Sequence, residues 1–345
     1  MTLPLSNFTA QASIRRLYLH EVEIADWQAT TKIDGGHVVV NPFKLALNGA
    51  PVTSTVDLDL GVAGWKYDTS LSAQAIPLAP LVNTFQPERK GQVGGTLTAQ
   101  AQIKGAGITG ASLQKNLAGQ FDVNTTNLNL SVVNIKSPVL KTLVNVVAAI
   151  PELIRNPTST LGSLIGGMMG QAGTSGGLAD DLQRSPINSI ILQGTAGAGR
   201  IELKKAVVQS PAFEADASSG TVTLAAVLTN SALQVPVAVS LSRPIAQRMN
   251  LVPAGTPTNA VYAKLPDFFT MTGTVGVPKS KIDYLALAST AGRSVGSALQ
   301  GLGGGVGGVL GSILGTTPAG TTNQPATNQL PVNNLIKGLF GPKKK

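Results

Sequence analysis

The sequence predicts a mainly β protein: one long, strongly twisted and curled antiparallel sheet that forms an apolar trough, with a helical insertion and C-terminal helices. Apolar and polar residues alternate along most of the chain, as in "GTLTAQAQIKGAG" at residues 95–107, and a period of two is typical of a half-buried strand. Aromatic residues make up only 4% of the chain and charged residues only 12%. Small aliphatic residues, Thr, Ser, Gly and Asn must therefore form most of the structure.

The first part of the chain is predicted to be a series of strands, separated by the Gly, Asn, Asp and Pro residues that turns favour. We expect these strands at residues 16–24, 37–47, 53–60, 65–74, 94–104, 119–123 and 127–132. "PLAPLVNTFQPERKG" predicts a short helix and loop, because Pro77 and Pro80 fit a first helical turn.

The period changes at "SPVLKTLVNVVAAIPELI", where Ser137 and Pro138 suit the cap and first turn of a helix. Apolar residues follow at helical spacing: Leu140, Leu143, Val144, Val147 and Ile150. No polar cluster accompanies them, so we expect this helix to pack against the sheet. It belongs to a helical insertion at about residues 137–183.

Alternation returns in "GRIELKKAVVQ", "TVTLAAVLT" and "LQVPVAVSLS", and a further strand is expected at residues 269–277. The sheet is thus predicted to cover residues 1–285. Residues 286–315 form a Gly-rich apolar segment with near-helical spacing, residues 316–329 a linker, and residues 330–345 an amphipathic basic tail. The uncharged run at 294–317 has the length of about 20 residues that a bilayer requires, but its glycines and serines make it a poor transmembrane helix.

The tail combines an apolar helical stripe with three lysines, a combination that suits contact with a membrane surface. An equally good reading docks the stripe on the sheet and leaves the lysines solvated. The candidate membrane contacts are Leu335, Ile336, Leu339, Phe340, Lys343, Lys344 and Lys345.

Composition argues against an enzyme. The chain has no cysteine, which excludes disulfides and thiolate chemistry, and its two histidines, His20 and His37, lie in strand patterns without a nearby partner. We therefore expect no catalytic residues, no metal and no cofactor. The net charge of +9 suits anionic lipid or nucleic acid, but the scattered aromatic residues argue against nucleic acid.

A sheet of roughly a dozen strands, at about 4.8 Å each, would extend on the order of 60 Å, and sheets of more than about ten strands curl or split. Curling with the aliphatic face inward would create a smooth apolar groove for a long apolar ligand such as an acyl chain. The candidate lining residues are Leu97, Ala99, Ala101, Ile103, Val222, Leu224, Ala226, Leu228, Val235, Val237 and Val239.

Several motifs resemble the C-terminal region of the AsmA family of bacterial envelope proteins. They are a Gly-led strand from Gly35-Gly36 to Asn48-Gly49, the Pro80-Leu81 pair in a short helix, and a strand with Leu117, Gly119 and Phe121. The resemblance extends over about residues 16–277. It implies a curled β-groove in a periplasmic, inner-membrane-anchored protein that supports outer-membrane integrity and carries phospholipid, in the manner of bridge-like lipid-transfer proteins.

The sequence shows neither an export signal nor the N-terminal transmembrane helix of that family, so we expect the inner-membrane anchor to lie outside this chain. Two functions follow. The first is a periplasmic envelope protein that binds or conducts phospholipid along the groove and supports outer-membrane biogenesis. The second is an assembly factor for outer-membrane proteins that acts by strand pairing without lipid. A well-packed interior closed by the helix at residues 138–150 would favour the second.

Overall fold

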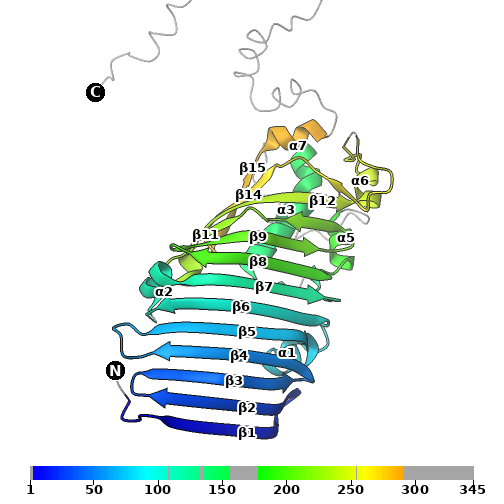
Figure 1. Cartoon of the computed structure of the whole chain (residues 1–345). Coiled ribbons are helices and arrows are strands. Elements are labelled where there is room, and N and C mark those ends of the chain that lie inside the picture. Colours follow the sequence, from blue (N-terminus) through cyan, green and yellow to red (C-terminus); the bar gives the residue numbers. More distant parts are fainter. Residues whose placement is uncertain (1–2, 108, 133–134, 156–177, 254, 291–345) are drawn as a thin grey trace, which may run out of the picture. The chain divides into compact units, whose positions relative to one another are not determined.

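The computed structural model describes residues 3–107, 109–132, 135–155, 178–253 and 255–290. They form one antiparallel sheet of fifteen strands with a few helices, most of them in its connections, so the predicted fold class is confirmed (Figure 1). The strands are β1 (Phe8–Leu19), β2 (Val22–Asp34), β3 (His37–Leu47), β4 (Ala50–Asp59), β5 (Lys66–Pro77), β6 (Thr96–Ala106), β7 (Ala118–Thr126), β8 (Ser189–Gly197), β9 (Arg200–Gln209), β10 (Phe213–Asp216), β11 (Thr221–Thr223), β12 (Ala232–Ser242), β13 (Tyr262–Lys264), β14 (Phe269–Gly273) and β15 (Pro278–Ile282).

Most strands pair with their neighbours in sequence. The order runs from β1 to β10 without a crossover and continues through β12, β14 and β15, while β11 pairs with β9 and β12, and β13 pairs with β12. Tight turns make this meander. Asn48 and Gly49, for example, both have positive φ (50° and 81°), as a two-residue turn between twisted antiparallel strands requires.

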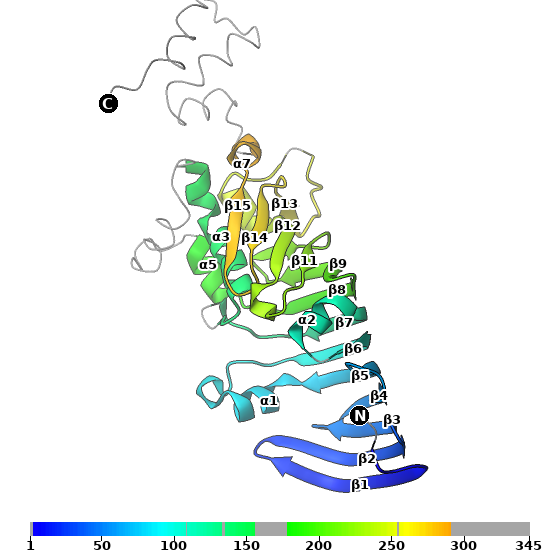
Figure 2. The same ribbon diagram turned by 90° about the vertical axis from the view of Figure 1, so that its left-hand side faces the viewer.

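Helices lie between β5 and β6, between β6 and β7, between β7 and β8 and between β12 and β13, a 3₁₀ turn lies between β11 and β12, and one helix follows the last strand. They are α1 (Leu78–Phe85) with the 3₁₀ turn η1 (Pro87–Arg89), α2 (Gly110–Asn116), α3 (Pro138–Arg155), α5 (Leu178–Arg184), the 3₁₀ turn η3 (Leu228–Asn230), α6 (Arg243–Arg248) and α7 (Tyr284–Thr290). The short helix predicted within residues 77–91 is confirmed as α1, and the helix predicted at residues 138–150 is confirmed as α3, which extends to Arg155. In Figure 2, α1, α3 and α5 lie on the same side of the sheet.

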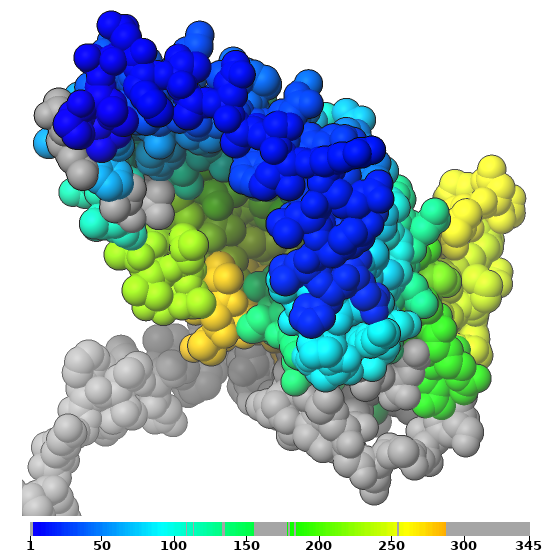
Figure 3. All heavy atoms as spheres, turned by 90° about the horizontal axis from the view of Figure 1, so that it is seen from below, coloured from blue at the N-terminus to red at the C-terminus, as the bar shows by residue number. Residues whose placement is uncertain are grey.

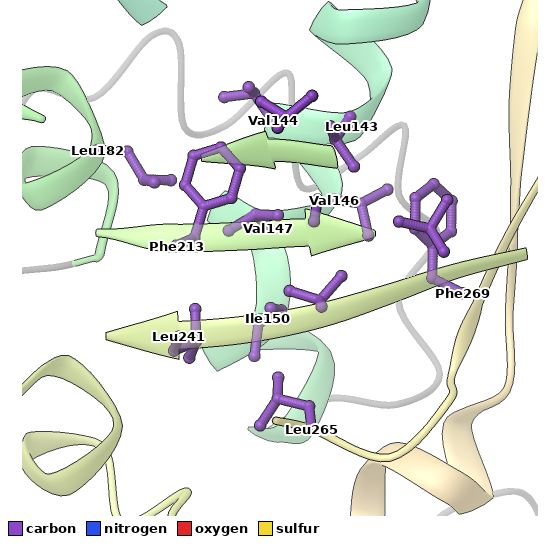
Figure 4. Packing of buried hydrophobic residues seen from close by; sticks show 14 of the residues in the cluster. Leu143, Val144, Val146, Val147, Ile150, Leu182, Phe213, Leu241, Leu265 and Phe269 are labelled. Atoms are coloured by element: carbon purple, nitrogen blue, oxygen red, sulfur yellow. The ribbon is translucent and has the colours of Figure 1, made fainter. Parts of the chain in front are cut away.

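The main core lies between α3 and the C-terminal strands. Val147 and Ile150 of α3 are fully buried, as are Phe213 of β10 and Leu241 of β12. Figure 4 shows these side chains facing one another between the helix and the strands. The apolar helical stripe read from the sequence is therefore the side of α3 that covers the sheet.

Three strand predictions are wrong in detail. Residues 16–24 are not one strand but the turn of the β1–β2 hairpin, in which Leu19 pairs with Val22, so the alternation continues through a reversal of direction. Residues 127–132 form only an isolated bridge between Leu130 and Ile187, because Asn127 turns the chain with φ of 52°.

The third concerns "TVTLAAVLT", where the strand ends at Thr223 and the chain bends into η3. Leu224 still donates its backbone N–H to the carbonyl oxygen of Gly199, but the next residue, Ala225, donates its N–H to the Ser231 hydroxyl oxygen and not to a strand. The linker, the tail with its membrane-contact candidates, and all of the Gly-rich segment except its start in α7 lie outside the described residues.

Candidate functional site

The apolar side of strands β1–β7, here called the open face, is the most distinctive surface of the sheet. Strand register lines up its side chains in rows across the strands. One such row contains Ala12, Ala29, Phe43, Ser54, Leu71, Ala101 and Phe121. Because alternate residues of each strand share this side, the open face is continuous from the β1 edge to β7.

All charged side chains of β3–β7 belong to the opposite side of the sheet. They alternate with the apolar positions, and register pairs them with other polar residues across the strands. They are His37, Lys44, Asp57, Asp59, Lys66, Asp68, Lys104 and Asp122. The sheet therefore separates a charged surface from an apolar one.

The open face is accessible. Leu17 and Leu19 are 49% and 47% exposed, and Leu71 in the middle of the face is 43% exposed. Figure 3 looks along the sheet from its β1 end and shows a hollow beneath the blue N-terminal strands, with α1 (cyan) on one side and the η3 loop (lime) on the other. The sheet thus forms a groove there rather than a packed interior.

The same apolar side is closed over the C-terminal strands. Val235, Val237 and Val239 of β12 are only 6%, 3% and 0% exposed, because α3 and its neighbours cover them. The predicted trough is therefore open over β1–β7 and filled by protein over the strands of the main core.

The candidate lining residues consequently fall into three groups. Leu97, Ala99, Ala101 and Ile103 are partly buried and lie together on the open face. The second group belongs to the main core, where Val222 is partly buried and Val235, Val237 and Val239 are buried. Leu224, after the end of β11, is also buried but lies outside that core cluster. Ala226 and Leu228 lie in the exposed η3 loop and not on a strand.

The length of the open face suits a hydrocarbon ligand. Seven strands at about 4.8 Å each measure on the order of 30 Å across, which is comparable to the hydrocarbon thickness of a bilayer, about 30 Å. A long apolar ligand laid across the strands would contact mainly Ala, Leu and Phe side chains, with Ser54 as the polar exception in the row given above.

Sequence reasoning missed Trp27 and Phe43, which lie together on the open face. Their ring centroids are 6.3 Å apart at an interplanar angle of 61°, an edge-to-face contact. The Trp27 Nε1–H is buried and finds no hydrogen-bond partner among the described residues. Extending the alternation of β2 and β3 to these positions would have identified both residues.

Helix α1 borders the open face at one end of its strands. Leu81 packs on Ala50, Ala73 and Ile76 of the sheet, while Glu21 in the β1–β2 turn holds the helix by polar contacts. Its carboxylate accepts a hydrogen bond from Asn83 Nδ2 at 2.6 Å and lies 2.6 Å from the Nζ atom of Lys90. Lys90, then Asn83, lower the pKa of Glu21.

The same rim continues toward α3. The Nζ atom of Lys136 lies 2.7 Å from the Oε1 atom of Glu88, and this contact lowers the pKa of Glu88. The α1–η1 segment is therefore tied both to the first hairpin and to the chain that enters α3.

A second, polar hollow of about 940 Å³ lies at the opposite ends of these strands. It is lined by Asp34, His37, Asp57, Asp59, Lys66, Asp68 and Lys104, among others. His37 contacts Asp57 at 2.8 Å, and both side chains are more than half exposed. His20 lies in the β1–β2 turn, one strand length away, about 40 Å, so the two histidines do not meet.

Within the part of the chain that the structure describes, no three His, Cys, Asp or Glu residues are grouped so that they could hold a metal ion. None of the helices described is long and apolar enough to cross a membrane.

Comparison with known proteins gives one result. No curated protein and no solved structure matches the chain. The model of the AsmA family matches residues 7–160, which contain strands β1–β7 and helices α1, α2 and α3. The resemblance of this chain to the AsmA family is thereby confirmed over the segment that forms the open face.

Proposed function

We propose that this chain binds phospholipid by its acyl chains on the open face of β1–β7 and so supports lipid transport and outer-membrane biogenesis from the periplasm. The match to the AsmA family supports an envelope-associated role. The chain acts in this proposal as a lipid-binding module and not as an enzyme.

The observation that carries the proposal is a continuous apolar face left uncovered. Contiguous exposed apolar surface of this kind marks a site for a ligand, a partner or a membrane. Leu71 illustrates the free-energy cost of leaving this apolar surface in water. It pairs with Ala101 and Ser54 across the strands and is still 43% exposed. Complete burial of an exposed Leu side chain gains about 1.5–3 kcal/mol, so an acyl chain that covers the exposed part of Leu71 would gain roughly 1 kcal/mol at this residue.

The filled half of the sheet defines where the ligand ends. Because α3 occupies the apolar side of the C-terminal strands, acyl chains on the open face would stop at this helix. The headgroup would remain at a rim of the groove, where polar side chains such as those of Glu21 and Lys90 lie.

Native mass spectrometry with lipid extraction tests the proposal on protein purified in mild detergent. We expect stoichiometric phospholipid with the wild type and its loss in Ala101→Asp, which places a carboxylate on the open face. Gln102→Asp is the matched control, because this neighbour lies on the other side of the same strand and is exposed. A lipid-free mass for the wild type, under conditions in which a known lipid carrier keeps its cargo, would contradict the proposal.

A second candidate function, assembly of outer-membrane proteins by strand pairing, is favoured by the β1 edge. β1 is twelve residues long, lacks proline and has only two charged residues, Arg15 and Arg16, so most of its length is free for another strand to pair with. The opposite edge, β15, has five residues, starts at Pro278 and contains Lys279 and Lys281. The packed interior under α3 also agrees with this function.

Hydrogen exchange distinguishes the two functions. If strand pairing is the activity, amides of β1 should gain protection when an unfolded outer-membrane protein is added, and no lipid should co-purify. If lipid binding is the activity, added phospholipid should protect β3–β6 instead.

A further inference from the structure

An exposed aliphatic cluster lies beside the groove, outside the open face. Val227 and Leu228 in the η3 loop are 57% and 61% exposed, and Val277 in the β14–β15 turn is 66% exposed. We call these three residues the aliphatic tip. In Figure 3 the η3 loop (lime) and β15 (orange), which begins directly after Val277, lie side by side at the border of the hollow.

The two segments that carry the tip are fixed to each other. Gly276 donates its backbone N–H to the carbonyl oxygen of Thr229 at 2.8 Å, and Val275 donates to that of Ser231 at 3.0 Å. A further bridge joins Ala232 to Thr274. The three aliphatic side chains are therefore presented by one hydrogen-bonded unit rather than by two independent loops.

Charge is distributed unevenly around the tip. Residues 221–238 and 268–278 contain no ionisable side chain, so no carboxylate belongs to either segment. The first charged residues after the turn are Lys279 and Lys281 of β15, both exposed, and neither forms an ion pair with a described residue. An apolar tip followed by unpaired basic side chains complements the hydrocarbon and phosphate layers of an anionic membrane.

From this arrangement we propose that the aliphatic tip is a membrane-contact site that inserts Val227, Leu228 and Val277 into the interface of an anionic lipid bilayer, with Lys279 and Lys281 at the phosphates. This contact would set one rim of the groove against the membrane. It does not require that the groove itself carry lipid.

The chain contains no cysteine, so single cysteines can report on the tip in the full-length protein. Leu228→Cys and Val277→Cys, labelled with the environment-sensitive dye NBD, are mixed with vesicles of phosphatidylcholine and phosphatidylglycerol at a ratio of three to one. We expect a blue shift and a rise in emission at both positions. Val261→Cys is the control, since Val261 is 71% exposed in a loop remote from the tip in sequence and joined to the start of α6.

The lysine contribution is tested separately. Lys279→Gln combined with Lys281→Gln should weaken binding to these vesicles on the order of tenfold, and pure phosphatidylcholine vesicles should bind weakly. The same change at Lys204 and Lys205, two exposed neighbours on β9, provides a control with equal loss of charge and should change binding less.

Two results would overturn the proposal. The first is protein that sediments with the vesicles while the dye on Leu228→Cys does not respond, because the contact then lies elsewhere in the chain. The second is a dye response of Val261→Cys that equals the response of Leu228→Cys. Failure of this proposal is separable from failure of the lipid-binding function. Purified protein that retains phospholipid but gives no response at Leu228 contradicts only the tip, and a response at Leu228 in protein that never retains lipid contradicts only the groove.

Discussion

Single residues determine how closely neighbouring strands approach, and Gly119 is the clearest case. Its φ is +155°, and a Cβ atom at this position would lie 2.1 Å from the carbonyl oxygen of Gln102 on β6. Such a contact forces backbone to move, so Gly119→Ala should destabilise the protein by about 1–3 kcal/mol. Gly197→Ala is the control, because no atom lies within 4 Å of its Cβ position. Urea denaturation measures both, and equal stability of the two variants would show that the β6–β7 approach is not tight.

Local sequence predicts on which side of a strand a residue lies, but not whether that side is covered. Ala101 and Val237 both lie in runs of strict alternation, and both were expected to line the trough. Ala101 is partly exposed on the open face, whereas Val237 is 3% exposed in the main core. The difference comes from α3, which is distant from both residues in sequence, so only the tertiary structure separates them.

At the scale of elements, the sequence predicts most strands and both longer helices because each has a distinct period. It fails at the β1–β2 hairpin, where alternation persists through the turn at His20, and at η3, where apolar residues continue after the strand has ended. In both cases the apolar pattern continues where the chain changes direction, so it does not show where a strand ends. Leu228 of the aliphatic tip lies in one of these places, which is why it was expected to line the groove.

The docking of α1 gives an element-scale prediction on pH. Lys90 and Asn83 lower the pKa of Glu21 below its ordinary value of 4.5, so the ionised carboxylate favours the folded state. This contribution is fully present above about pH 4.5 and is lost as the pH falls through the lowered pKa of the folded protein. Glu21→Gln should therefore lower the thermal midpoint more at pH 7 than at pH 3. A midpoint difference that is equal at both pH values would show that the carboxylate charge does not hold α1.

On the scale of the whole sheet, one apolar side serves two purposes. Over β12 and β14 it is the core beneath α3, and over β1–β7 it is a groove. Helix α3 packs on the C-terminal strands and stabilises that half of the sheet, whereas in the described part of the chain no comparable layer of helices covers β1–β7. A sheet with one exposed apolar side has fewer buried contacts to hold it, and regions with few such contacts open at lower free energy.

We therefore expect amide exchange to divide the sheet. In lipid-free protein, amides of β3–β5 should exchange faster than those of β12, because opening them exposes little additional apolar surface. Addition of phospholipid should slow exchange in β3–β6 and leave β12 and β14 unchanged, since a ligand stabilises only the region that binds it. Hydrogen exchange followed by mass spectrometry of peptic fragments measures both effects. Equal protection of β4 and β12 before lipid is added would mean that the groove is closed in solution, and slowing centred on β12 would place the lipid beneath α3 instead of on the open face.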